Sequence, residues 1–207
     1  MQLYRRLHRH YGDLDWWPGE TPLEVSVGAI LTQNTAWRNV KRAIANLKAA
    51  GALTPGAMAA LPRQELAQLI VPSGYYNMKA AKLRNFLDFL YGGYGGSLNR
   101  LFALDAPRLR EALLGVNGIG PETADSIILY AAKKPIFVID AYTRRILSRH
   151  GLARGDEPYD TLRLLFEDNL SSDVSLFNEY HALIVYVGHT WCKRTPLCGE
   201  CPLKIFL

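Results

Sequence analysis

Apolar side chains recur at helical spacing through most of the chain, three or four residues apart along one face. The spacing is clearest in residues 36–50, 78–91, 158–170 and 173–188. Runs of glycine, proline and asparagine separate these segments, as helix breakers do. Only residues 136–139 have the pattern of a short strand, and they run directly into a helix start. The sequence therefore predicts an all-α fold of about ten packed helices.

The composition is that of a globular protein with a modest positive charge. The 207 residues, 49% hydrophobic and 21% charged, suffice for one large or two small domains, which excludes a disordered chain. No apolar run approaches the ~20 residues of a membrane helix, and the N-terminus has no apolar signal core, so we expect a cytoplasmic protein. The net charge of +5 fits a solvated surface or a nucleic-acid partner. Five basic residues crowd one stretch: Arg144, Arg145, Arg149, His150 and Arg154.

Residues 113–132 have the pattern of two helices joined by a glycine turn. An apolar helix ends, Gly118-Ile119-Gly120 follow, and Pro121 opens the next helix, where its missing N–H is no loss. Glycine allows a left-handed backbone and the close approach of another molecule. The free N–H groups of the new helix would then face an anion such as a DNA phosphate, with Gly118 and Gly120 beside it. A plain glycine-capped turn is the alternative.

A second signal follows the hairpin, where an apolar run delivers Asp140 to a basic, amphipathic helix. Aspartate is a favoured N-cap residue, and capping alone would explain it there. The hairpin together with Val138-Ile139-Asp140 nevertheless resembles the helix-hairpin-helix (HhH-GPD) superfamily of DNA glycosylases, which includes endonuclease III. The blocks LTQNTAWRNV and PSGYYNMKAAKL are similar to that family as well, so the likeness runs from about residue 16 to the C-terminus.

The resemblance implies a fold and a partner. The fold would have two helical domains, residues 21–134 and residues 1–20 plus 135–207, with a DNA cleft between them. The partner would be damaged double-stranded DNA, from which base excision repair removes a damaged base.

In this family the catalytic carboxylate stands where Asp140 stands here. A glycosylase flips the base out of the duplex and breaks its bond to the sugar through an oxocarbenium-like transition state. A carboxylate near the sugar stabilises that charge and activates water. Bifunctional members carry a lysine two residues after the second hairpin glycine, and this chain has Glu122 there. We therefore expect a monofunctional enzyme that leaves an abasic site and has no lyase activity.

Within the family, the chain is most similar to bacterial 3-methyladenine DNA glycosylases of the endonuclease III type. It shares their Trp-Trp-Pro, their Gln-Asn-Thr block followed by an aromatic residue, and their residues 74–80. The resemblance implies a base pocket formed by Trp16, Trp17, Pro18, Trp37 and Glu122. Aromatic walls suit an alkylated purine, which is cationic and stacks on a ring. The alternatives are a core role for Trp37 and a hydrophobic staple between domains for Trp16-Trp17.

The resemblance also implies residues that contact DNA. Gln33 would fill the gap left by the flipped base, and Tyr75 would be a second wedge between bases. An ordinary polar residue and a surface aromatic residue are the respective alternatives. Phosphate contacts would come from the hairpin glycines and from Lys79, Thr123 and Arg144.

All three cysteines, Cys192, Cys198 and Cys201, lie close together, which is a poor disulfide framework and is typical of metal ligands. Related proteins hold a [4Fe–4S] cluster with four such cysteines, and the fourth position here is Leu207. An iron–sulfur cluster with an incomplete cysteine set, loss of that cluster, and a zinc site with His189 as fourth ligand are all open. A cofactor of either kind would be structural and is not required for the chemistry.

The sequence thus predicts a monomeric base excision repair glycosylase for alkylated purines such as 3-methyladenine, in the cytoplasm of a bacterium or archaeon and associated with the nucleoid. Two alternatives stay open. One is an endonuclease III-type glycosylase and lyase for oxidised pyrimidines or mismatched uracil and thymine. The other is a DNA-lesion-binding protein without catalytic activity.

Overall fold

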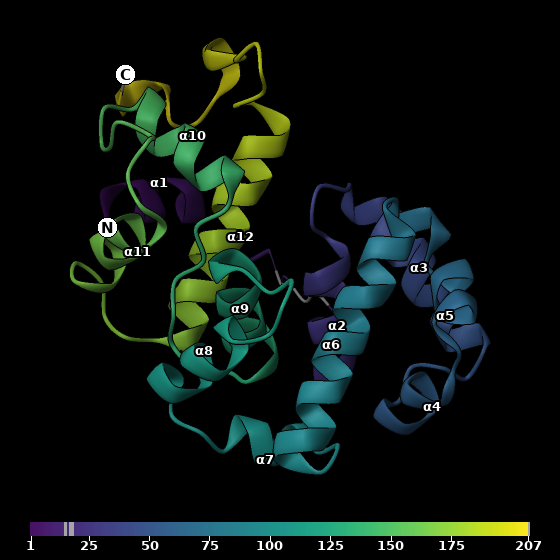
Figure 1. Cartoon of the computed structure of the whole chain (residues 1–207). Helices are drawn as coiled ribbons and strands as arrows, with labels where there is room; N and C mark the ends of the chain where they lie inside the picture. The colour runs from purple at the N-terminus through teal and green to yellow at the C-terminus, as the bar shows by residue number, and fades with distance from the viewer. Residues whose placement is uncertain (15, 17–18, 207) are drawn as a thin grey trace. The chain divides into compact units, whose positions relative to one another are not determined.

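The computed structural model describes residues 1–14, 16 and 19–206. All regular structure in this part of the chain is helical, and no strand forms there (Figure 1). The predicted all-α fold is confirmed. Residues 136–139 are buried but belong to no helix or strand, so they serve as a buried connection. None of the described helices is both long and apolar enough to cross a membrane.

The chain divides into two compact units. The terminal unit combines both ends of the chain, Met1–Trp16 and Lys134–Leu207. The central unit is the continuous segment Trp17–Lys133.

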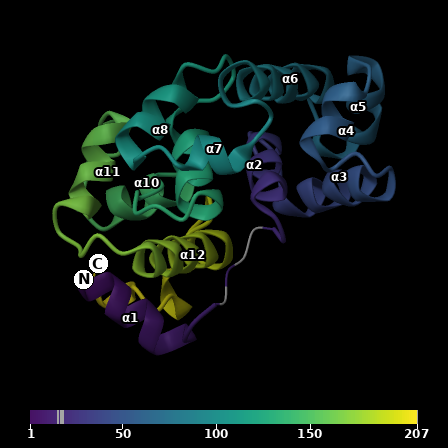
Figure 2. The same ribbon diagram turned by 90° about the horizontal axis from the view of Figure 1, so that it is seen from below.

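The central unit is built around α2 and α6. Its elements are α2 (Pro22–Leu31), α3 (Trp37–Ala49), α4 (Pro55–Ala60), α5 (Arg63–Leu69), the 3-10 turn η1 (Val71–Ser73), α6 (Tyr76–Tyr94), α7 (Leu98–Phe102), α8 (Ala106–Leu114), α9 (Pro121–Ser126) and the π-helical η2 (Ile127–Ala131). Helix α2 is apolar and almost wholly buried, and it packs against α3, α6, α9 and η2. Helices α4 and α5 pack against α6, with α3 beside α5 (Figure 2).

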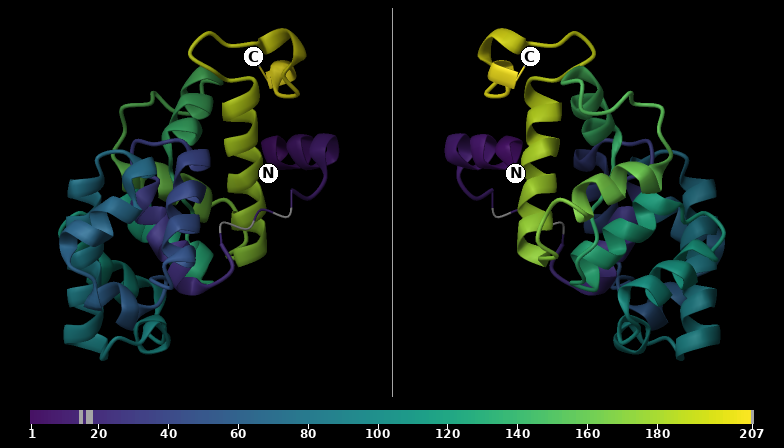
Figure 3. Two further views of the ribbon diagram at one scale, coloured as in Figure 1. Left: turned by 90° about the vertical axis from the view of Figure 1, so that its right-hand side faces the viewer. Right: turned by 90° about the vertical axis from the view of Figure 1, so that its left-hand side faces the viewer.

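The terminal unit is built around α12. Its elements are α1 (Gln2–Tyr11), α10 (Ala141–Arg149), α11 (Tyr159–Glu167), α12 (Val174–Thr190) and the 3-10 turns η3 (Cys198–Glu200) and η4 (Lys204–Phe206). Helices α1 and α10 both pack against α12, and the cysteine-containing segment follows the C-terminal end of α12 (Figure 3). The core is aromatic: the Phe137 and Phe166 rings stack with centroids 3.8 Å apart, and Phe177 and Tyr180 meet Phe137 edge-on.

The observed helices follow local signals in the sequence. The four segments with clear helical periodicity coincide largely with α3, α6, α11 and α12. Side chains that accept a hydrogen bond from a backbone N–H three residues on begin many of the helices. These capping residues are Thr21, Thr54, Ser97, Asp105, Asp140 and Asp173. Helices as short as α4, α5 and α7 span too few turns to show a periodic pattern, so the expected number of helices was too low.

Candidate active site

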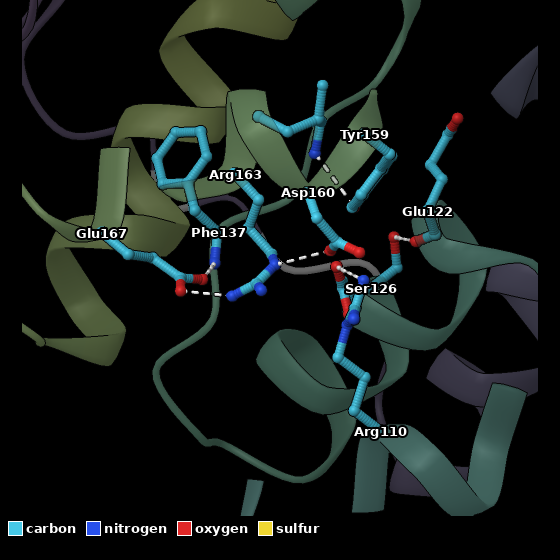
Figure 4. A network of polar contacts seen from close by, with 10 residues as sticks. Arg110, Glu122, Ser126, Phe137, Tyr159, Asp160, Arg163 and Glu167 are labelled. Atoms are coloured by element: carbon cyan, nitrogen blue, oxygen red, sulfur yellow. Dashed lines mark hydrogen bonds and ion pairs between the residues drawn. The ribbon is translucent and has the colours of Figure 1, made fainter. Parts of the chain in front are cut away.

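Asp140 stands where a buried connection meets helix α10 in the terminal unit. Two hydrogen bonds fix the backbone just before it: Phe137 N donates to Glu167 Oε1 at 2.8 Å, and Ile139 N donates to the Tyr159 hydroxyl at 3.2 Å (Figure 4). Arg163 holds Glu167 through an ion pair. These contacts from α11 set the position from which the Asp140 side chain projects.

The Asp140 carboxylate caps α10, as the sequence predicts. Its Oδ1 accepts hydrogen bonds from Thr143 N at 2.7 Å and from the Thr143 hydroxyl at 2.8 Å. Thr143 is fully buried, and 13% of the Asp140 side chain is exposed. Two donors on one oxygen stabilise its charge and fix the carboxylate in a single orientation, with a small part still accessible.

His181 is the neighbour of Asp140 that the sequence analysis missed. It lies on α12, is buried, and its Nε2 is 3.9 Å from Asp140 Oδ1. Burial lowers the pKa of His181, and the nearby negative charge of Asp140 opposes that shift. In the sequence, His181 falls at an interior position of an amphipathic helix and looks like one more core residue. The one sequence signal for a functional role was that a polar residue occupies an interior position of the helix.

The arginines of α10 are largely occupied within the terminal unit. Arg144 Nη1 donates to Glu157 O at 2.8 Å. Arg145 donates to the carbonyls of Cys192 and Gly188, and Arg149 donates to those of Lys193 and Arg194. The basic stretch therefore ties the C-terminal segment to α10. The phosphate contact expected from Arg144 stays a prediction, and its guanidinium already has a backbone partner.

The three cysteines line one small cavity of about 20 Å³ in the terminal unit, with Arg149 and His150 also in its wall. Arg149 Nη1 donates to Cys192 Sγ at 3.3 Å, a contact that suits a thiolate. Burial and the other two cysteines raise the pKa of the Cys201 thiol. Within the described residues, no group of three or more His, Cys, Asp or Glu side chains is arranged to hold a single metal ion.

This geometry changes the zinc alternative. His189 is exposed and does not line the cavity, whereas His150 does. The zinc alternative with His189 as fourth ligand stays untested, and in this structure His189 lies outside the cavity that the three cysteines share. Leu207 lies outside the described residues.

The hairpin of the central unit has the predicted local structure. Helix α8 ends at Leu114, and α9 begins at Pro121. Gly118 has a φ of 96°, and a Cβ there would lie 2.5 Å from Lys82 Cγ, so only glycine fits. Gly120 is the N-cap of α9 and supplies no side-chain cap. The first N–H groups of α9 consequently have no capping side chain.

Gln33, just after the C-terminal end of α2, is hydrogen-bonded to this hairpin. Its Nε2 donates to Gly118 O and to Thr123 Oγ1, both at 3.0 Å, and its Oε1 accepts a hydrogen bond from Lys82 Nζ. Gln33 is therefore held within the central unit rather than extended into solvent. Thr123 is buried, and its expected phosphate contact stays a prediction. Lys82, which the sequence analysis did not select, is half-buried beside the glycine turn.

Lys79 is buried, with 2% of its surface exposed. Its ammonium donates to Leu31 O at 2.8 Å and to Ser73 O at 2.7 Å. Burial, with a smaller contribution from the charge of Lys82, lowers the pKa of Lys79 to about 8. Lys79 thus joins the end of α2 to the turn before α6, and the phosphate contact expected from it stays a prediction.

The remaining predicted residues differ in exposure. Tyr75 is 68% exposed and has a left-handed φ of 45° at the N-terminus of α6, so its side chain projects from a strained backbone. Glu122 is exposed in the first turn of α9. Trp37 is half-buried, with its ring against Gly28 of α2. Trp16 is half-buried in the terminal unit. Trp17 and Pro18 lie outside the described residues, and the base pocket as a whole stays a prediction.

Comparison with known proteins agrees with this arrangement of a glycine hairpin followed by a capping aspartate. Residues 27–171 match the HhH-GPD superfamily of base excision DNA repair proteins. The chain is 45% identical over 206 residues to the protein MJ1434 of Methanocaldococcus jannaschii, whose name proposes a DNA repair glycosylase; the match covers 99% of this chain and 94% of that one. The chain belongs to the HhH-GPD superfamily and is a DNA repair glycosylase of that family.

Two solved structures have the same fold. One is the Helicobacter pylori 3-methyladenine DNA glycosylase MagIII bound to 1,N6-ethenoadenine, with a TM-score of 0.77, 28% identity and coverage of 91% of this chain and 96% of that one. The other is a non-covalent complex of endonuclease III with DNA, with a TM-score of 0.85, 22% identity and coverage of 99% and 92%. The second likeness concerns the fold alone.

Proposed function

We propose that the protein is a monofunctional glycosylase that hydrolyses the bond between an alkylated purine and its sugar in double-stranded DNA. The observation that carries this proposal is the Asp140 carboxylate, which two donors orient and which is still partly accessible. The similarity to MagIII supports a purine substrate. Asp140, Glu122 and the hairpin glycines occupy the positions that the family resemblance assigns to catalysis and DNA binding.

Asp140 would act directly on the reacting sugar. The base is flipped out of the duplex and leaves with the electron pair of its bond to C1′, which leaves positive charge on the sugar. The carboxylate stabilises that charge, a water attacks C1′, and Asp140 accepts the proton that the water loses. The products are a free base and an abasic site. An alkylated purine is already cationic and needs little help to leave.

Glu122 supports the proposal that the enzyme has no lyase step. A lyase needs a free amine that attacks C1′ and forms a Schiff base. Glu122, which stands where bifunctional members have that lysine, has no amine. The ammonium of Lys79, in the same unit, is buried and bonded to two carbonyls. We therefore expect no covalent enzyme–DNA intermediate.

The central unit would supply contacts to the duplex. The first turn of α9 has no capping side chain, so its N–H groups suit a phosphate beside Gly118 and Gly120. Exposed Tyr75 suits a wedge that replaces a stacked base. Gln33 would have to leave its bonds to Gly118 and Thr123 to fill the gap opposite a flipped base. We expect the protein to bind DNA as a monomer.

An iron–sulfur cluster is proposed as a structural cofactor of the C-terminal segment. Three cysteines facing one cavity, and an arginine donor on Cys192 Sγ, suit thiolate ligands of such a cluster. When bound, the cluster would cross-link the segment that follows α12. The cavity is small, so the cysteine side chains would have to move apart to admit it.

Base release and strand cleavage, measured in one reaction, test the proposal. Purified protein is incubated with duplex DNA that contains 3-methyladenine, and with a matched duplex that contains an oxidised pyrimidine. We expect release of 3-methyladenine, no nicks, and no adduct trapped by borohydride. Release of the oxidised pyrimidine with nicks would favour the endonuclease III-type alternative. Binding without release from either duplex would favour a lesion-binding protein.

A further inference from the structure

The buried imidazole of His181 faces the proposed catalytic carboxylate from a different helix. Asp140 begins α10, His181 lies in the middle of α12, and these two helices pack against each other. Nε2 of His181 is 3.9 Å from Oδ1 of Asp140, which is slightly too long for a hydrogen bond. A shift of about 1 Å in either side chain would close that gap.

The surroundings of His181 leave its imidazole little freedom. The Phe137 ring stands perpendicular to the imidazole, with centroids 6.4 Å apart. Tyr180, the preceding residue on α12, also packs edge-on against Phe137. Burial lowers the pKa of His181, which favours the neutral imidazole, and a neutral imidazole carries one ring N–H that can donate. A donor held at this place can reach Asp140 and little else on α10.

Two polar side chains on the helices around Asp140 are engaged with backbone atoms. On α10, Arg144 donates to Glu157 O. On α11, the Tyr159 hydroxyl accepts from Ile139 N. On α12, His181 is the ionisable residue that acts electrostatically on Asp140. The imidazole is therefore placed to act on the carboxylate oxygen that Thr143 already orients.

We propose that His181 is a positioning residue for Asp140: in the complex with DNA its Nε2–H donates to the carboxylate and fixes the carboxylate toward the reacting sugar. The inference rests on the proposed catalytic role of Asp140. The bond adds a third donor to a group that must stay oriented while positive charge develops beside it. Misplacement of a catalytic group by about 1 Å can cost about 100-fold in rate, so loss of this donor should be visible in the chemical step.

Single-turnover base release from 3-methyladenine DNA, with binding measured separately, tests this role. His181→Phe keeps an aromatic ring and removes the donor, and we expect the rate to fall about 10- to 100-fold with unchanged DNA affinity. His181→Gln places an amide N–H near the position of Nε2, and it should recover much of the lost rate. Tyr180→Phe removes a polar atom from the same helix without touching Asp140, and it should react at the wild-type rate.

Nuclear magnetic resonance supplies a readout that needs no activity. The pKa of His181 is measured in the wild type and in Asp140→Asn. Because the charge of Asp140 raises the pKa of His181, we expect a lower value in the variant. An equal pKa in both proteins, a wild-type rate in His181→Phe, or an equal loss in Tyr180→Phe would each overturn the inference. If the wild type releases no base, the proposed function fails, while the pKa comparison still decides whether His181 acts on Asp140.

Discussion

Helices α9 and α10 begin in opposite ways, although both follow apolar segments and both have an acidic residue close to the start. Asp140 caps α10 with its own side chain and occupies the N–H group of Thr143. Helix α9 begins at Gly120 and Pro121 with no side-chain cap, and its acidic residue, Glu122, is exposed in the first turn. The two helix starts therefore differ in chemistry, although each has an acidic residue close by: the acidic side chain caps α10 but not α9.

The difference shows how capping decides what a helix start can bind. At α10 a free backbone N–H at the positive end of the helix donates to the capping aspartate, and this bond fixes the carboxylate. At α9 the same positive end is left without a cap, which suits an external anion. One start thus supplies a fixed negative group, and the other supplies, in the proposed complex, donors for a phosphate.

The largest expected effect is at the capped start. Asp140→Asn keeps a good N-cap residue but removes the charge, so the fold should persist while base release falls by about 10² to 10⁴-fold. Single-turnover base release and circular dichroism measure the two quantities. Asp140→Ala is the companion variant, and it should also lose about 1 kcal/mol of stability because the cap is gone. Substantial base release by Asp140→Asn would contradict the catalytic assignment.

A smaller effect is expected when the uncapped start is given a cap. Gly120 has an extended backbone (φ −93°, ψ 178°), and a Cβ there would meet no atom within 4 Å, so Gly120→Asp should fold. The new side chain would cap α9 as Asp140 caps α10 and raise the free energy of unfolding by a few tenths of a kcal/mol. Its charge would repel a phosphate, so we expect about tenfold weaker binding of duplex DNA.

The control for that experiment is Gly120→Ala, which adds a side chain without a cap or a charge. Its affinity for DNA should lie much closer to that of the wild type, as measured by equilibrium titration at one fixed salt concentration. Equal affinity of Gly120→Asp and the wild type would show that no phosphate contacts this helix start.

A further expected effect, on stability alone, concerns Lys79, which joins the end of α2 to the turn before α6. The pKa of Lys79 is about 8 in the folded chain and 10.5 ordinarily. Between these values the unfolded chain binds more protons, so the contribution of Lys79 to the free energy of unfolding rises with pH. Lys79→Met removes that contribution. The stability difference between the two proteins should therefore shift in favour of the wild type as the pH rises from about 8 to about 10.

Chemical denaturation at several pH values measures this shift. The exposed Lys41→Met on α3 is the matched control, since Lys41 has the same charge without the burial. A pH-independent difference for Lys79→Met would mean that the Lys79 ammonium is not desolvated in the folded chain.

Local sequence signals predicted the two helix starts well. The turn at Gly118, the opening of α9 at Pro121 and the cap by Asp140 each depend on residues within a few positions of one another. Such features follow from backbone preferences and short-range hydrogen bonds, which a single sequence displays directly. The same holds for the long amphipathic helices α3, α6, α11 and α12.

Side-chain roles that depend on distant partners were less predictable. Lys79 was expected to bind phosphate, but its ammonium finds the carbonyls of Leu31 and Ser73, which come from two other elements. His181 was counted as a core position because its partner is 41 residues away in the sequence, at Asp140. Nothing near either residue in the sequence indicates the partner. Only packing of whole helices brings these groups together.

The division of the chain also determines which unit is completed first during translation. The central unit is continuous, so a ribosome delivers all of it before Asp140 has been made. The terminal unit must wait, because α1 packs against α12, and nearly the whole chain separates them. The hairpin can thus fold while the carboxylate is still missing. During translation, a chain with its central unit complete would be able to make the proposed hairpin contact with DNA before it could release a base.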